Sequence, residues 1–351
     1  MKCLKTRCVA ARGVYKAVWL KIVLGSLLLA GCTTTPPAQS PQAGSTPSWT
    51  PSAQSQINYE PINRPLSTTG CGLASPIAPG RSADVTIVSH PAVSEGQRTR
   101  TYRVHVPTIY EAHQSVPVVL VFHGYTGTAT GMEQGSGFSQ LADQENFIAV
   151  YPQGLPDGDG GAPFWASVGP IDNGVDDVLF VSDVLSDLQR KFCIDARRIY
   201  VTGFSNGGGM TGFLACRLAG RIAAFAPVSG NFYNPPGGCS PGRPVPILDF
   251  HGTADHVLPY DGIPTSVNAA WPLPPISQWL QTWAARNGCT GGPTIFLREP
   301  RVTGEQWSGC RDSSVVIHYR IEGGGHSWPP VIDGRSPASV MWRFFQAHPL
   351  A

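Results

Sequence analysis

Residues 198–218 read RIYVTGFSNGGGMTGFLACRL, and this stretch decides the fold. The β-branched and aromatic run at 198–202 predicts a buried strand, and residues 206–218 predict the helix that follows it. Between them, residues 203–207 form the pattern glycine-x-serine-x-glycine, whose small residues permit a tight turn from strand to helix. Such a turn raises the hydroxyl of Ser205 above the end of a sheet, where it is accessible for chemistry.

A second copy of the pattern occurs at 238–242, and the context of the two copies separates them. Ser240 follows a loop sequence, Asn-Pro-Pro-Gly, rather than an apolar strand. The residue after it is Pro241, which has no backbone N–H to offer an oxyanion, whereas Asn206 has one. Ser205 is therefore the predicted nucleophile.

The rest of the chain predicts an α/β fold around this turn. From about residue 67 onward, apolar β-branched runs alternate with helical patterns, which is typical of a mostly parallel sheet with helices on both faces. We predict eight strands, at 85–89, 101–106, 118–122, 147–151, 198–202, 224–228, 245–251 and 314–321. We predict four helices, at 175–192, 206–218, 276–287 and 337–347.

A serine hydroxyl becomes a strong nucleophile only when an adjacent base takes its proton. His326 is the candidate base, because it follows three glycines directly after the last predicted strand, where a bent loop can bring the imidazole to the turn. The remaining histidines after Ser205 lie in or beside strands or in the C-terminal tail, and structural roles suit them better. They are His251, His256, His318 and His348.

Asp255 is the candidate acid that orients this histidine. It follows the predicted strand 245–251 at its carboxyl end, where active sites of parallel sheets form. A carboxylate there can accept the Nδ1 proton of His326 and stabilise the imidazolium. Asp249 lies inside the strand and Asp261 lies further into the loop, so both are weaker candidates.

Two backbone N–H groups are needed to stabilise the negative charge that develops on a carbonyl oxygen during acyl transfer. The first predicted donor is Asn206, directly after the nucleophile. The second should come from the loop after an earlier strand, and the apolar run 118–122 leads into such a loop. We predict Tyr125 as this donor, with Gly124 and Thr126 as open alternatives.

Charge argues against a nucleic-acid partner. Lys and Arg total 25 against 23 Asp and Glu, but six of the basic residues lie within the first 31 residues, which contain no acid. The remainder holds 19 basic and 23 acidic residues, so a mature domain has no basic excess to attract phosphates. No cysteine or histidine spacing matches a zinc site, and we expect neither a metal nor an organic cofactor.

The N-terminal segment predicts export. A basic stretch and an apolar run at 22–30 precede Leu29-Ala30-Gly31-Cys32, which resembles a bacterial lipobox. We therefore expect a signal peptide at 1–31, lipidation of Cys32, a Pro/Ser/Thr-rich tether at 32–66 and a catalytic domain at 67–351. The predicted location is extracellular or on the cell envelope, anchored to a membrane by lipid. An ordinary signal peptide with an incidental cysteine is the alternative.

Cysteine usage agrees with export. Six of the nine cysteines remain after the predicted signal and lipidation site, and an even set in an exported protein predicts three disulfides. Six cysteines allow 15 pairings. We favour Cys71 with Cys193, Cys216 with Cys239, and Cys289 with Cys310, the last two from their proximity in sequence.

Six motifs along the chain resemble those of one protein family. They are TGCG (69–72), FHG (122–124), VDDV (175–178), GFSNGG (203–208), HGTAD (251–255) and GHSWP (325–329). Together they resemble the secreted α/β-hydrolase esterases that include feruloyl esterases and polyhydroxybutyrate depolymerase-like proteins, over about residues 67–349. The resemblance implies that fold, a triad of Ser205, Asp255 and His326, and cleavage of esters attached to plant polysaccharide or polyester.

The substrate expected from this resemblance is a feruloyl-type ester of plant cell-wall xylan. Trp165 and Trp328 are candidates for lining a pocket for an aromatic acyl group such as ferulate, and packing roles are the alternative. Three other functions remain open: a depolymerase of polyhydroxybutyrate or hydroxyalkanoate oligomers, an acetyl xylan esterase, and a non-catalytic, lipid-anchored binding protein.

Overall fold

The computed structural model describes residues 60–89, 99–156, 160–166, 168–169 and 174–351. The predicted signal peptide, the lipidation of Cys32 and most of the predicted tether lie outside the described residues. Within the described ranges, no helix has the length and apolar character needed to cross a membrane.

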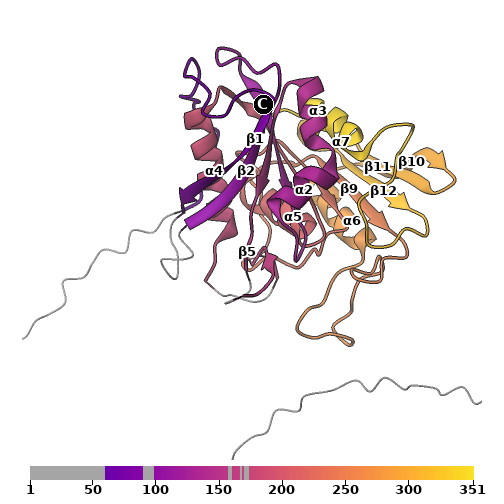
Figure 1. The fold of residues 1–351 in the computed structure, drawn as a ribbon. Helices are drawn as coiled ribbons and strands as arrows, with labels where there is room; N and C mark the ends of the chain where they lie inside the picture. Colours follow the sequence, from indigo (N-terminus) through magenta and orange to yellow (C-terminus); the bar gives the residue numbers. More distant parts are fainter. Residues whose placement is uncertain (1–59, 90–98, 157–159, 167, 170–173) are drawn as a thin grey trace, which may run out of the picture. The chain divides into compact units, whose positions relative to one another are not determined.

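One large sheet organises the domain (Figure 1). In spatial order its strands are β1 (Arg81–Val88), β2 (Thr99–Val106), β4 (Ile148–Pro152), β3 (Val116–Phe122), β7 (Ile194–Phe204), β8 (Ala224–Val228), β9 (Ile247–Gly252), β12 (Val316–Ile321), β11 (Val302–Ser308) and β10 (Gly291–Glu299). The strands from β4 to β12 pair in parallel, and both edges pair antiparallel. The predicted mostly parallel sheet is confirmed, and all eight predicted strands are present.

The predicted strand number of eight is wrong, because the described part of this sheet has ten strands. The two missed strands, β10 and β11, form an antiparallel hairpin at one edge. Most side chains of β10 are exposed, so the strand has no continuous apolar run to mark it. Its start at Gly291-Gly292-Pro293 and the glycine at 304 in β11 also suggest a turn rather than strands. A separate two-stranded pair, β5 (Leu155–Pro156) with β6 (Pro163–Phe164), was also missed.

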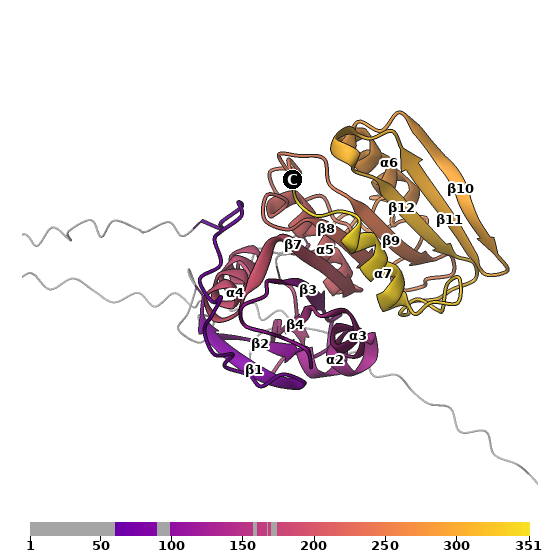
Figure 2. The same ribbon diagram turned by 90° about the horizontal axis from the view of Figure 1, so that it is seen from above.

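Helices cover both faces of the sheet, as predicted (Figure 2). On one face lie α4 (Asp177–Lys191), α5 (Asn206–Arg217) and α6 (Ile276–Asn287), and on the other lie α2 (Ala129–Ser136), α3 (Phe138–Glu145) and α7 (Pro337–Gln346). The central strand β3 is buried on both sides, with Val118 and Leu120 in one core and Val119 and Val121 in the other. Helices α2 and α3 were not predicted, because each is only eight residues long and two glycines interrupt the pattern of α2.

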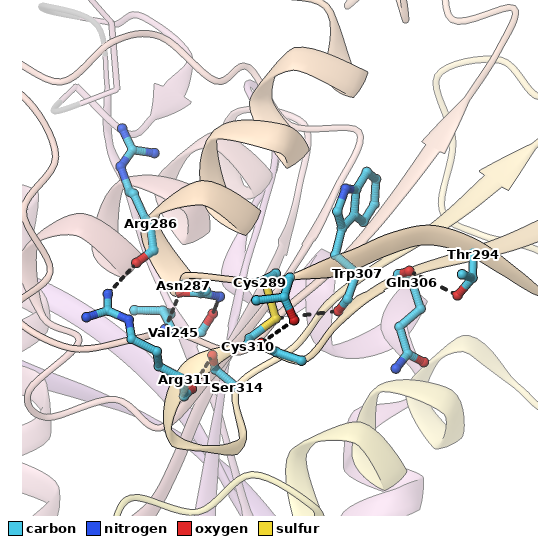
Figure 3. The surroundings of a disulfide bond; sticks show 12 residues. Val245, Arg286, Asn287, Cys289, Thr294, Gln306, Trp307, Cys310, Arg311 and Ser314 are labelled. Atoms are coloured by element: carbon cyan, nitrogen blue, oxygen red, sulfur yellow. Dashed lines mark hydrogen bonds between the residues drawn. A yellow bond between two sulfur atoms is a disulfide. The ribbon is translucent and has the colours of Figure 1, made fainter.

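Three disulfides join the pairs that we favoured from the sequence: Cys71–Cys193, Cys216–Cys239 and Cys289–Cys310. The last of them ties the end of α6 to the end of β11 (Figure 3). Beside it, the Asn287 side chain accepts a hydrogen bond from Val245 N–H (2.8 Å) and donates one to Val245 C=O (2.7 Å). The edge hairpin is therefore fixed to the chain that enters β9.

The last residues of the predicted tether, 60–66, contact the domain. Ile62 N–H donates to Ser182 Oγ of α4 (2.9 Å), and Asn63 Oδ1 accepts from Gly220 N–H (2.7 Å). Polar contacts hold this segment, and contacts of that kind leave no apolar periodicity in the sequence. Residues 62 and 63 of the predicted tether are therefore attached to α4 and to the segment after α5.

Candidate active site

The turn at 203–207 places Ser205 where the sequence predicted. β7 ends at Phe204, α5 begins at Asn206, and Ser205 between them has φ 57° and ψ −120°. A non-glycine residue in this region is strained, and such strain concentrates at functional sites. The flanking glycines are required for close packing, because a Cβ at Gly203 would collide with the carbonyl of Gly207. Ser240, by contrast, is exposed in a loop.

Ser205, His326 and Asp255 form a continuous hydrogen-bonded chain. The distance from His326 Nε2 to Ser205 Oγ is 2.8 Å, and that from His326 Nδ1 to Asp255 Oδ2 is 2.7 Å. With Asp255 ionised, Nδ1 carries the proton and Nε2 is left to accept the serine proton. The structure therefore brings together three residues that are 50 or more positions apart in sequence, in the arrangement that a Ser-His-Asp triad requires.

The surroundings of Asp255 keep its carboxylate charged. The side chain is fully buried, and Oδ1 accepts hydrogen bonds from the N–H groups of Val257 (2.9 Å) and Leu258 (2.8 Å). Burial alone would raise the pKa of this carboxyl group. The hydrogen bonds from His326 and from the backbone outweigh burial, so the pKa of Asp255 lies below its usual value. The group can thus stabilise an imidazolium at neutral pH.

Two aromatic side chains support the imidazole. The ring of Phe204 lies 4.9 Å from the ring of His326, and Trp328 packs edge-on against Phe204 with 6.5 Å between centroids. Trp328 is half-buried, so part of its surface faces solvent near the site. Phe204 was not singled out from the sequence. It is the residue directly before the serine, and the tight turn brings it beside the base.

The loop after β3 lies directly against the nucleophile. A Cβ placed on Gly124 would be 3.1 Å from Ser205 Cβ. The N–H of Thr126 donates to Pro163 C=O (2.9 Å), and no acceptor for the N–H of Tyr125 is present among the described residues. Asn206 is the first residue of α5, where backbone N–H groups have no partner within the helix. These observations favour Tyr125 over Thr126 as the second oxyanion donor beside Asn206.

The prediction that Trp165 lines a substrate pocket is wrong, because this side chain is fully buried. Its indole N–H donates to His123 C=O (2.8 Å), and its backbone N–H donates to Asn206 Oδ1 (2.7 Å). Trp165 thereby joins the loop after β3 to the start of α5. These are the two segments that carry the candidate oxyanion donors, so the residue holds them in register rather than contacting substrate.

The side chain of His123 also fixes this loop, at its first residue. Its Nε2 accepts from Gly154 N–H (2.9 Å), so the ring proton is on Nδ1 and is donated to Gly124 C=O (2.7 Å). Burial lowers the pKa of His123, which keeps the ring neutral. Within the residues that the structure describes, no group of three or more His, Cys, Asp or Glu side chains could hold a metal ion.

Mild acid is expected to weaken the fold. Burial lowers the pKa of both His123 and His251 below the usual value of 6.5 in the folded protein. As pH falls below about 6.5, the unfolded chain binds protons that the folded chain does not, so the free energy of unfolding decreases. We expect the urea midpoint to fall between pH 7.5 and 5.5, and to fall less in His251→Asn. The matched control, His256→Asn, changes an exposed histidine of the loop that follows β9. An equal effect of both variants would contradict a role of the buried His251 in this pH dependence.

Gly207→Ala is expected to destabilise the protein by about 2 kcal/mol. An added Cβ would collide with the carbonyl oxygens of Phe122 and His123, which belong to the rigid central sheet and the loop after it. Gly135→Ala in α2 is the matched control, because a Cβ there meets nothing within 4 Å and should be neutral or stabilising. Urea unfolding followed by circular dichroism measures both. Equal stabilities would contradict the close packing at this turn.

Comparisons with known proteins find esterases among the relatives of this chain. Residues 101–236 match the family described as esterase PHB depolymerase. Feruloyl esterase B of Piromyces equi is 34% identical over 229 residues, covering 64% of this chain, and the chain spans 42% of that protein's length. Feruloyl esterase C of Emericella nidulans is 29% identical over 259 residues, covering 71% of this chain and 84% of that protein.

One solved structure supports the fold. The acetyl xylan esterase from Aspergillus awamori superposes with a TM-score of 0.53 at 18% sequence identity, covering 75% of this chain and 99% of that one. At 18% sequence identity, this structural similarity shows only that the two proteins share a fold, which is the sheet covered by helices on both faces.

Proposed function

We propose that the chain is a serine carboxylic-ester hydrolase of the α/β-hydrolase esterases that include feruloyl esterases and polyhydroxybutyrate depolymerase-like proteins, which its similarity to such proteins supports. The observation that carries this proposal is the hydrogen-bonded chain from Ser205 through His326 to Asp255, at 2.8 and 2.7 Å. It links a strained serine at the head of a helix to a base and to a buried, ionised acid.

The geometry supports a two-step reaction through an acyl-enzyme. Ser205 Oγ attacks the ester carbonyl while His326 Nε2 takes its proton, and Asp255 stabilises the imidazolium. The N–H groups of Asn206 and Tyr125 stabilise the negative charge on the carbonyl oxygen. His326 then gives the proton to the departing alcohol. A water molecule, deprotonated by the same histidine, hydrolyses the acyl-enzyme and restores Ser205.

The proposed substrate is a feruloyl-type ester of plant cell-wall xylan. The relatives named feruloyl esterase B and feruloyl esterase C support ferulate as the acyl group of the substrate. A relative from Neocallimastix patriciarum, named as a bifunctional acetylxylan esterase/xylanase, supports xylan as the polysaccharide that carries the ester. Acetylated xylan is the second candidate. The family description also keeps oligomers of hydroxybutyrate as a candidate. Trp328, half-buried beside Phe204, remains our candidate for contact with an aromatic acyl group.

We also propose that the protein is exported and anchored through lipid on Cys32. Three disulfides support export, since such bonds persist in oxidising compartments. Labelling cells with a radioactive fatty acid tests the anchor. Label that disappears in Cys32→Ser would support lipidation, and label that remains in the variant would exclude it.

The function is tested with three esters given to the purified protein: methyl ferulate, an acetylated xylan fragment and a hydroxybutyrate trimer. We expect release of ferulate to be fastest. Hydrolysis of the trimer alone would replace the xylan assignment with a polyester. Failure to hydrolyse any of the three, together with no labelling by a fluorophosphonate, would favour the non-catalytic binding protein.

A further inference from the structure

A cavity of about 470 Å³ lies between α5 and α6, beneath the loops that follow β8 and β9. This volume falls within the range of roughly 300–1,000 Å³ that is usual for ligand sites. Gly209 lines it and stands one helical turn, about 6 Å of rise, beyond Ser205. The lining of the cavity therefore comes within one helical turn of the candidate nucleophile and continues along α5 to Cys216.

Aromatic rings and prolines form the walls. Phe213, Tyr233 and Trp279 line the cavity and are partly exposed. Phe232 stacks on one face of Trp279, with 3.7 Å between centroids and 9° between planes, which fixes the indole in place. Rigid aromatic surfaces of this kind bind the apolar C–H faces of a ring-shaped ligand at little entropic cost.

The rim of the cavity is polar and carries little charge. Asn234, Thr265, Gln278 and Thr282 line it and are exposed to solvent. Arg286 is the charged side chain among its described lining residues, and none of these is a carboxylate. Amide side chains both donate and accept hydrogen bonds, so the rim suits a neutral ligand rich in hydroxyl groups. A polyester chain offers carbonyl acceptors but has no donors along its length.

We propose that this cavity binds the glycan that carries the ester, so that the enzyme recognises the polysaccharide as well as the bond that it cleaves. This inference rests on the proposed function. In the sheet, β3 with its Tyr125 loop lies on one side of β7, whereas β8 and β9 lie on the other. The ester carbonyl oxygen points to the Tyr125 side. The departing alcohol, which is the glycan, takes its proton from His326, and the loops after β8 and β9 that line the cavity lie on the side of β7 away from the Tyr125 loop.

Binding of a glycan without an ester tests the cavity independently of catalysis. Xylotriose is titrated calorimetrically into the full-length Ser205→Ala protein, and we expect saturable binding. Adding Gln278→Ala should weaken binding about five-fold, the usual worth of one hydrogen bond. Gln281→Ala is the matched control, since Gln281 is an exposed glutamine of the same helix that does not line the cavity. A hydroxybutyrate trimer that binds where xylotriose does not would overturn the proposal.

The second readout is the ratio of kcat/KM for a feruloylated xylo-oligosaccharide to kcat/KM for methyl ferulate. This ratio should fall about five-fold in Gln278→Ala and stay constant in Gln281→Ala. An unchanged ratio in Gln278→Ala would overturn the glycan site while leaving the esterase assignment intact. If no ester is hydrolysed at all, the proposed function fails, and the calorimetric titration still decides whether the cavity binds a glycan.

Discussion

Replacing Ser205 with alanine is expected to reduce kcat for ester hydrolysis by roughly 10⁴- to 10⁶-fold. The alcohol oxygen that forms the acyl-enzyme is removed, and the candidate oxyanion donors and binding surfaces alone supply only a small residual rate. The loss corresponds to about 5–8 kcal/mol of transition-state stabilisation. Steady-state kinetics on methyl ferulate measures it, with circular dichroism to verify the fold.

The matched control for this variant is Ser240→Ala, which changes the serine of the other glycine-x-serine-x-glycine sequence. Ser240 is exposed in a loop, so its replacement should leave the kinetics unchanged. If Ser205→Ala retained more than a tenth of the wild-type rate, Ser205 would not be the nucleophile, whatever its geometry.

Replacing Asp255 with asparagine is expected to lower kcat by about 10⁴-fold. The fully buried carboxylate accepts the Nδ1 proton of His326 at 2.7 Å, and this fixes the tautomer in which Nε2 can accept the serine proton. An amide in its place can donate to Nδ1 instead and so favours the wrong tautomer. It also removes the charge that stabilises the imidazolium. Kinetics on a small ester, which needs no distant binding contact, measures the loss.

Asp261→Asn provides the control, because Asp261 is an exposed carboxylate of the same loop. We expect it to retain wild-type kinetics. Equal activity of the two variants would mean that another group orients His326. Asp249 of β9, whose Oδ2 lies 2.9 Å from Nδ1 of His318 in the adjacent strand β12, would then be the next residue to replace with asparagine.

The central part of the fold could be predicted because its strands are buried on both faces and therefore appear as continuous apolar runs. β3 and β8 are the clearest cases, since every residue in each is buried. The edge hairpin of β10 and β11 could not be predicted in this way. Most side chains of β10 are exposed, and the pairing of β11 depends on contacts with β12 that no local pattern encodes.

The residues that the structure brings together as a triad could be predicted because each follows the carboxyl end of a recognisable strand. Ser205 follows β7, Asp255 follows β9 and His326 follows β12, and parallel strands place these ends at one edge of the sheet. The surroundings of the site could not be predicted. Trp165 is buried by contacts with His123 and Asn206, which lie about 40 positions away on either side, and a sequence pattern carries no record of such packing.

The most direct test of the account is to identify the residue that a fluorophosphonate labels. The reagent forms a bond between phosphorus and an activated serine oxygen and releases fluoride, so mass spectrometry of the digested protein locates the adduct. If Ser205 is the nucleophile, a single adduct forms on the peptide that contains Ser205, and none forms in Ser205→Ala. An adduct on Ser240 or on any other serine, or no adduct on the folded protein, would contradict this assignment.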